Sequence, residues 1–190
     1  MSMPRISTQD EWQAARTQLR TKEDAVLKAR DAVVAERRRL PMVEVEQNYA
    51  FQGPAGRVGL LDMFDGRRQL LLYRFWFAPG EEPCPGCSQW VRNLGHLESL
   101  HAQDVSLVMV SRAPSVELEA VRERRGWTVP WFSAVGDDFD AETGYTGEAQ
   151  VTALLHNEEK IFRTYGTDGQ VLETIGSYWT LMDLTPLGYR

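Results

Sequence analysis

Two adjoining stretches decide the expected fold: Leu70-Leu71-Leu72-Tyr73-Arg74-Phe75-Trp76-Phe77 and Cys84-Pro85-Gly86-Cys87. The first is rich in leucine and aromatic residues on both faces, as is typical of a central strand covered on both sides. The second holds the only two cysteines of the chain and opens an amphipathic helix with apolar residues at helical spacing, namely Cys87, Trp90, Val91, Leu94 and Leu97. A strand that leads into Cys-x-x-Cys at a helix start indicates a redox pair.

The position of the pair assigns a different role to each cysteine. At the helix N-terminus, Cys84 meets unpaired backbone N–H groups and the positive end of the helix dipole, which stabilise a thiolate and favour a nucleophile. Cys87 lies in the same turn and is expected to resolve a mixed disulfide formed on Cys84. Pro85 suits the first helical position, where its missing N–H needs no partner. Pro85 and Gly86 are expected to set the redox poise of the pair.

Composition bounds the class of protein. The chain has 190 residues, 43% of them hydrophobic, which suits one large α/β unit or one domain with an appendage. Its net charge of −6 argues against nucleic acid or an anionic membrane as a partner. The N-terminus lacks an apolar signal core and the apolar runs are too short to span a bilayer, so we expect a cytoplasmic protein. A structural disulfide is unusual in the reducing cytoplasm. Thiol-disulfide exchange by the cysteine pair needs no bound cofactor, so none is expected.

The remaining elements follow in an order that predicts the fold. Residues 105–110 form a second buried-type strand, residues 116–125 a helix ended by Gly126, and residues 131–135 a short strand. Residues 151–156 and 161–165 flank a turn in a hairpin pattern. A last amphipathic helix carries Val171, Leu172, Ile175, Tyr178, Trp179 and Met182. The order β-α-β-α-β-β-α predicts the thioredoxin fold, an α/β fold with a central mixed sheet flanked by helices, over residues 42–190.

Residues 1–41 are expected to form an N-terminal helical extension. Thr8 and Glu11 make a capping-box pattern at the start of one long helix, and Pro41 stops it. Apolar residues recur every seven positions, at Trp12, Leu19, Val26, Val33 and Leu40. The seam is narrow and needs a second surface, which is either the helix's own domain or a second copy of the chain in a homodimer. After Pro41, the alternation of Val43 and Val45, the Gly53 to Gly56 turn and the apolar residues 58–64 predict a hairpin that enters the sheet.

Several motifs together resemble those of one bacterial family. They are Trp12 in the long helix, Ala35-Glu36-Arg37-Arg38, Leu40-Pro41, Gly53-Pro54 before Gly56, Cys84-Pro85-Gly86-Cys87-Ser88, Val110-Ser111-Arg112-Ala113-Pro114, Gly126-Trp127-Thr128-Val129-Pro130-Trp131 and Asp183-Leu184-Thr185-Pro186-Leu187-Gly188. Over nearly its whole length the chain resembles a bacterial domain-of-unknown-function family of thioredoxin-like proteins, predicted dithiol-disulfide oxidoreductases. The resemblance implies the fold and a redox-active pair. The family usually has His where this chain has Arg74, and its tail usually continues where this chain ends in Tyr189-Arg190.

Other residues are candidates for supporting the pair. Arg112 follows the second buried strand, at the sheet edge where the strands' C-terminal ends meet, and is expected to face the sulfurs. Arg74 or Arg112 would favour the thiolate, whereas Glu81 and Glu82, just before the pair, would oppose it. Trp127 and Trp131 flank Pro130, and these three residues are candidates for a substrate groove.

Three alternative functions compete with that of a dithiol oxidoreductase. A thiol peroxidase of the peroxiredoxin type is weakened, because neither register of its Pro-x-x-x-Thr/Ser-x-x-Cys loop fits the residues before Cys84 or Cys87. A zinc site from Cys84, Cys87, His96 and His101 is disfavoured, because one helix through these residues would separate them too far for one ion, so we expect no metal. A redox-inert adaptor that binds partners through the long helix is the third. The expected partners of an oxidoreductase are a protein or small-molecule thiol or disulfide and an external dithiol electron donor.

Overall fold

The computed structural model describes residues 4–45, 49–134, 139–140, 147–158, 160–182 and 184–185. The chain divides into two compact units, Met42–Met182 and a second unit that groups Met1–Pro41 with Asp183–Arg190. Among the described residues, no helix combines the length and the apolar character that crossing a bilayer requires.

The long helix α1 spans Gln9–Arg37 and begins at the expected cap. The Glu11 N–H donates to Thr8 Oγ1, while Glu11 Oε2 accepts from the Thr8 N–H, so the predicted capping box is confirmed. No residue of α1 is buried. The five apolar positions of the heptad pattern are all about half exposed, from 48% at Leu40 to 67% at Val26.

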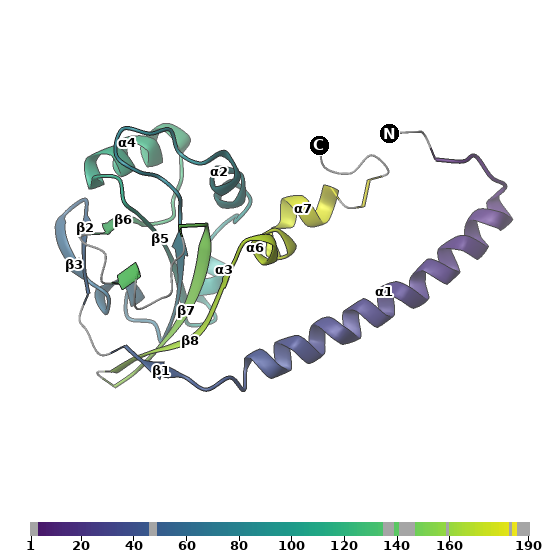
Figure 1. Ribbon diagram of the computed structural model, residues 1–190, viewed down its shortest axis with the longest axis horizontal. Helices are drawn as coiled ribbons and strands as arrows, with labels where there is room; N and C mark the ends of the chain where they lie inside the picture. Colours follow the sequence, from purple (N-terminus) through teal and green to yellow (C-terminus); the bar gives the residue numbers. More distant parts are fainter. Residues whose placement is uncertain are drawn as a thin grey trace. The chain divides into compact units, whose positions relative to one another are not determined.

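The unit Met42–Met182 is built on one eight-stranded sheet with the order β1-β8-β7-β4-β5-β6-β2-β3 (Figure 1). The strands are β1 (Val43–Glu44), β2 (Ala50–Gly53), β3 (Gly56–Gly59), β4 (Gln69–Arg74), β5 (Val105–Ser111), β6 (Trp131–Ala134), β7 (Gln150–Asn157) and β8 (Lys160–Asp168). Strand β4 runs parallel to β5 and antiparallel to β7, and β7 runs antiparallel to β8. This mixed sheet with its helices has the thioredoxin fold, as the sequence predicted.

Strand β4 is central and contributes to a core on each face of the sheet. On one face Tyr73 joins Leu107, Met109 and Trp131 in a cluster that includes residues of helices α2 (Pro85–Arg92), α4 (Ser115–Arg125) and α6 (Gln170–Ile175). On the other face, Leu72 and Val108 join a cluster that includes residues of the β2 strand and of the 3-10 helix η1 (Asp62–Phe64). Successive residues of β4 therefore point into different cores.

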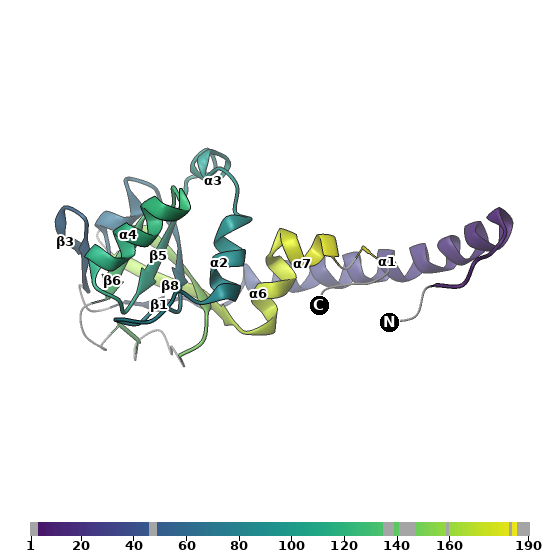
Figure 2. The ribbon, with the colours of Figure 1, turned by 90° about the horizontal axis from the view of Figure 1, so that it is seen from above.

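The helix after the cysteines is shorter than the sequence pattern indicated. Helix α2 ends at Arg92 with Asn93 as its C-cap, Gly95 has a φ of 68°, and a separate helix α3 (Glu98–His101) follows (Figure 2). A left-handed backbone at Gly95 ends the helical path, so the expected continuous helix through Leu97 is wrong.

The final helix is also divided, into α6 and α7 (Ser177–Met182) on either side of Gly176. Ser177 Oγ donates to the carbonyl of Asn93, which ties the start of α7 to the end of α2. The side chains of Tyr178, Trp179 and Met182, which the sequence pattern placed on one amphipathic face, lie outside the described residues, as does the motif residue Asp183.

The region after Pro41 enters the sheet at both of its edges. Residues 50–53 and 56–59 form the β2–β3 hairpin around the predicted turn, at one edge. Strand β1 does not belong to that hairpin, because it pairs with β8 at the other edge, where Lys160 donates to a Glu44 carboxylate oxygen at 2.9 Å. The expected single hairpin of residues 43–64 is therefore wrong, and the segment beyond Gly59 turns into η1.

Candidate functional site

Backbone hydrogen bonds fix Cys84 at the start of α2. Its N–H donates to the carbonyl of Trp76 at 3.2 Å, and its own carbonyl accepts from Ser88 at 2.9 Å. Cys84 is the N-cap of α2 and Pro85 is the first helical residue, as the sequence predicted. The Cys87 N–H donates to Cys84 Sγ at 3.4 Å, so this sulfur satisfies a donor that a helix N-terminus otherwise leaves unpaired.

The two cysteines are close but lie in different environments. Both are thiols, Cys84 is half-buried and Cys87 is only 2% exposed, and they approach each other to 3.2 Å. A hydrogen bond from the Cys87 thiol is the largest cause that lowers the pKa of Cys84 to about 6, and the N–H groups of Cys87 and Gly86 add to it against the opposing effect of burial. Cys84 is therefore mostly a thiolate at neutral pH.

The pKa of Cys87 shifts in the opposite direction. It is raised because the Cys87 thiol holds its proton in the hydrogen bond to Cys84, and burial raises it further. Hydrogen bonds from the Tyr73 side chain and the Trp76 backbone oppose this rise, since both stabilise the Cys87 thiolate. The arrangement gives one accessible nucleophile and one inner thiol with its own hydrogen-bond donors.

A pocket of about 160 Å³ opens beside the two sulfurs. It is lined by Tyr73, Cys84, Gly86, Cys87, Trp90, Glu148, Ala149, Gly169 and Leu172. The indole of Trp90 and the ring of Tyr73 stack with centroids 4.3 Å apart and form one wall. The pocket joins the end of β4, the start of α2, the segment before β7 and the start of α6.

Sequence reasoning identified the cysteines and Gly86 but missed the other lining residues. Tyr73 carried a usable signal, because it lies in the strand that leads to the cysteines and alternates with Arg74. Glu148 and Leu172 carried none, since the pairing of β7 with β4 and the packing of α6 bring them in from far along the chain.

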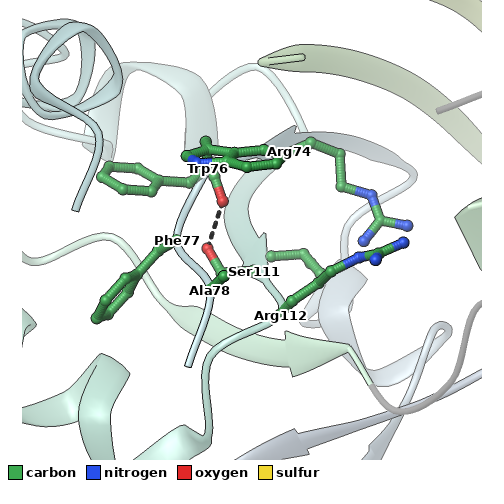
Figure 3. A pocket seen from close by; sticks show the side chains of 8 residues that line it. Arg74, Trp76, Phe77, Ala78, Ser111 and Arg112 are labelled. Atoms are coloured by element: carbon green, nitrogen blue, oxygen red, sulfur yellow. Dashed lines mark hydrogen bonds between the residues drawn. The ribbon is translucent and has the colours of Figure 1, made fainter. Parts of the chain in front are cut away.

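Arg74 and Arg112 lie together, but at another site. Figure 3 shows their guanidinium groups side by side. They lie at the C-terminal ends of β4 and β5, and both form ion pairs with the buried carboxylate of Asp140. The Arg112 Nη2 to Asp140 Oδ2 distance is 2.8 Å, and Arg74 is almost fully buried. The two arginines line a separate hollow with Trp76, Phe77, Ala78 and Ser111, and neither lines the cysteine pocket.

The expectation that Arg112 faces the sulfurs is corrected by this geometry. Arg74 and Tyr73 are neighbours in β4, so their side chains leave opposite faces of the sheet, and only Tyr73 reaches the cysteines. The causes that shift the pKa of Cys84 include neither arginine. Asp140, which the sequence did not point to, binds the two guanidinium groups beside the core cluster that contains Leu72 and Val108.

The tryptophans that flank Pro130 belong to the core. Trp127 and Trp131 are 8% and 3% exposed and pack with Phe75, whereas Pro130 is exposed. Trp131 Nε1 donates to Ser111 Oγ at 2.9 Å, and Ser111 Oγ donates to the carbonyl of Phe75 at 2.6 Å. The expected groove between the two indoles is therefore replaced by a packed aromatic cluster.

The histidines of the weighed zinc pattern lie apart from the cysteine pocket. The break after α2 removes the single helix on which the spacing argument was based, and the His96 side chain is 92% exposed beside Glu98. Within the described ranges, no group of three or more His, Cys, Asp or Glu side chains is arranged to hold a metal ion.

The fold places this chain in the class of thioredoxin-fold proteins, and similar solved structures include a peroxidoxin and a thioredoxin. Peroxidoxin BcpB from Mycobacterium tuberculosis is 15% identical, with a TM-score of 0.50 over 73% of this chain and 97% of the other. The exposed lipoprotein thioredoxin Etrx1 from Streptococcus pneumoniae is 10% identical, with a TM-score of 0.49 over 68% and 100% of the two chains. No curated protein matches the sequence. The chain belongs to the DUF899 family of bacterial proteins of unknown function, whose pattern matches residues 1–190.

Proposed function

We propose that this protein is a thiol-disulfide oxidoreductase in which Cys84 is the attacking thiolate and Cys87 the resolving thiol. The observation that carries the proposal is the asymmetry of the pair. Cys84 is half-buried with a pKa of about 6, and Cys87 is buried within 3.2 Å of it with a raised pKa. A low-pKa thiolate at an exposed helix start is suited to begin thiol exchange.

The proposed cycle transfers two electrons in two exchange steps. The Cys84 thiolate attacks one sulfur of a substrate disulfide, forms a mixed disulfide and releases the other half as a thiolate. Cys87 then loses its proton and attacks Cys84 Sγ, which closes the Cys84–Cys87 disulfide and releases the second thiolate. The substrate disulfide is reduced by two electrons and the protein is oxidised by two. An external dithiol restores the reduced pair by the reverse steps: one of its thiolates attacks Cys84 Sγ and releases Cys87, and its second thiolate then attacks the mixed disulfide and releases Cys84.

The proposed cycle exchanges electrons with two external partners, a substrate disulfide and a dithiol donor. No bound cofactor takes part, since the electrons enter and leave through sulfur. Pro85 and Gly86 set the poise through the geometry of the helix start, and Gly86 lines the pocket that a substrate enters. A second copy of the chain is proposed to cover the apolar stripe of α1, because an apolar repeat of seven residues is typical of helices wound around one another.

A thiol peroxidase is the second candidate, favoured by the lowered pKa of Cys84. In that reaction the thiolate attacks a peroxide oxygen and becomes a sulfenic acid, with release of water or an alcohol. Cys87 would then condense with the sulfenic acid to give the same disulfide and a second water.

Thiol counting at controlled redox poise tests the main proposal. The protein is equilibrated with mixtures of reduced and oxidised dithiothreitol and, for more oxidising potentials, of reduced and oxidised glutathione, then alkylated and weighed by mass spectrometry. We expect both thiols to disappear together in a two-electron transition, while Cys87→Ser gives only adducts on Cys84. A pair that stays reduced at every ratio contradicts the proposal. Treatment with hydrogen peroxide tests the peroxidase, which requires faster loss of the thiols than a free thiol shows.

A further inference from the structure

Among the described residues, the cysteine pocket has apolar walls and one charged wall residue besides the reacting sulfurs. Tyr73, Trp90, Ala149 and Leu172 provide apolar surface, and Glu148 provides a carboxylate. Glu148 is held beside a glycine, because its Oε2 lies 3.5 Å from the position that a Cβ on Gly169 would occupy. Gly169 has a φ of 53°, so the left-handed backbone favours glycine there.

Two further carboxylates lie just before the nucleophile in the sequence. Glu81 and Glu82 are exposed and lie three and two residues before Cys84, which is itself a thiolate near neutral pH. Among the described residues that line the pocket, none is a lysine or an arginine. Arg74, at the end of β4, and Arg112, just after β5, are paired with Asp140, away from the cysteine pocket.

The volume of the pocket limits what can enter it. A cavity of about 150 Å³ in another protein holds one benzene molecule. The 160 Å³ beside Cys84 is of that size, so it can take a substituent of about six non-hydrogen atoms. A larger thiol, such as a tripeptide, would have to leave most of its atoms outside.

We propose that the pocket selects a compact disulfide or thiol whose substituent is neutral or cationic, and that Glu148 discriminates against anionic ones. This inference deepens the proposed function and rests on it, since the chosen molecule is the one that exchanges with Cys84. An anionic substituent would enter beside Glu148 and the thiolate, whereas a cationic one would be attracted by both. Because Glu148 is exposed to solvent, the expected preference is on the order of threefold per unit charge and weakens as salt is added.

Three disulfides of similar length and different charge provide the test. They are cystamine, bis(2-hydroxyethyl) disulfide and 3,3′-dithiodipropionate, whose substituents are cationic, neutral and anionic. The rate of oxidation of the reduced full-length protein is measured for each at low salt and divided by its rate with a free model thiol. We expect cystamine to react fastest and dithiodipropionate slowest. Because the substituents of these two differ by two unit charges, the ratio between them should fall about ninefold in Glu148→Gln. The control Glu123→Gln, in α4 and outside the pocket lining, should leave it unchanged.

The outcomes separate this inference from the function on which it rests. Equal normalised rates for the three reagents, with the pair oxidised normally, overturn the inference and leave the oxidoreductase standing. A preference that is undiminished in Glu148→Gln also overturns it, because groups other than Glu148 then set the charge selectivity. If none of the three disulfides oxidises the pair, the proposed function fails and the inference fails with it. High salt that removes the preference in the unmodified protein supports it.

Discussion

The hydrogen bond between the two thiols decides the reactivity of Cys84, because it is the largest cause of the lowered Cys84 pKa. We expect the alkylation of Cys84 by iodoacetamide to rise with pH around a midpoint near 6, and Cys84 to be labelled before Cys87. In Cys87→Ala the midpoint should move up towards the ordinary cysteine pKa of about 8.5, since the donor is lost. Peptide mapping at low conversion measures both effects.

Cys87→Ser is the matched control for this prediction, because its hydroxyl can still donate to Cys84 and should preserve more of the shift. An unchanged midpoint in Cys87→Ala would assign the low pKa to the helix start alone. The same pKa links to stability. A depressed pKa stabilises the reduced folded protein above the unfolded pKa, about 8.5. That contribution is lost as the pH falls through the folded value of about 6.

The Tyr73 side chain forms a hydrogen bond to the inner thiol, Cys87. Its hydrogen bond lowers the pKa of Cys87 against the larger effects that raise it. Tyr73→Phe keeps the ring that stacks on Trp90 and removes only the hydroxyl, so the Cys87 thiolate should form less readily. We expect resolution of a mixed disulfide on Cys84 to slow about fivefold, which corresponds to one ordinary hydrogen bond.

The decay of the Cys84 mixed disulfide, followed by mass spectrometry over a range of pH, measures this effect. Tyr49→Phe is the control, because Tyr49 belongs to the core on the other face of the sheet. It should leave the decay rate and its pH profile unchanged. If Tyr73→Phe lowers the melting temperature but does not change the decay rate, Tyr73 supports packing only.

At the scale of elements, the local signals were reliable wherever one segment decides its own structure. The Thr8 and Glu11 cap, the buried strands β4 and β5, the Pro85 start of α2 and the Gly126 end of α4 all follow from nearby residues. Each depends on a backbone group that has to be satisfied within a turn, or on apolar residues that recur along one segment.

Features that depend on partners far along the chain were not readable from the sequence. Strand β1 pairs with β8, about 120 residues later, although its alternation suited a local hairpin. Asp140 meets Arg74 and Arg112 only because β4 and β5 are parallel neighbours. The placement of Arg74 beside the cysteines was the avoidable error, since neighbours in a strand point to opposite faces and Tyr73 already occupied the cysteine side.

At the scale of the whole molecule, the residues of the candidate site all belong to the unit Met42–Met182. The four pocket walls come from β4, α2, the segment before β7 and α6. Each wall is held by the sheet or by the core cluster that contains Tyr73 and Leu107. The candidate site therefore contains no residue of α1. We expect removal of residues 1–41 to leave the Cys84 alkylation midpoint unchanged.

The apolar stripe of α1 supplies the last prediction. Trp12, Leu19, Val26, Val33 and Leu40 repeat every seven residues and are about half exposed. A straight helix drifts by about 20° per heptad, so a sustained repeat of seven favours a second helix wound around it. We expect a dimer at micromolar concentration by light scattering, and a monomer when residues 1–41 are removed. Val26→Lys places a charge on the stripe and should dissociate the dimer, whereas Leu27→Lys, one residue beside it and also exposed, should not. A full-length chain that is monomeric would show that the stripe has another cover. In that case residues 42–190 would melt at a lower temperature with no prior change in oligomeric state.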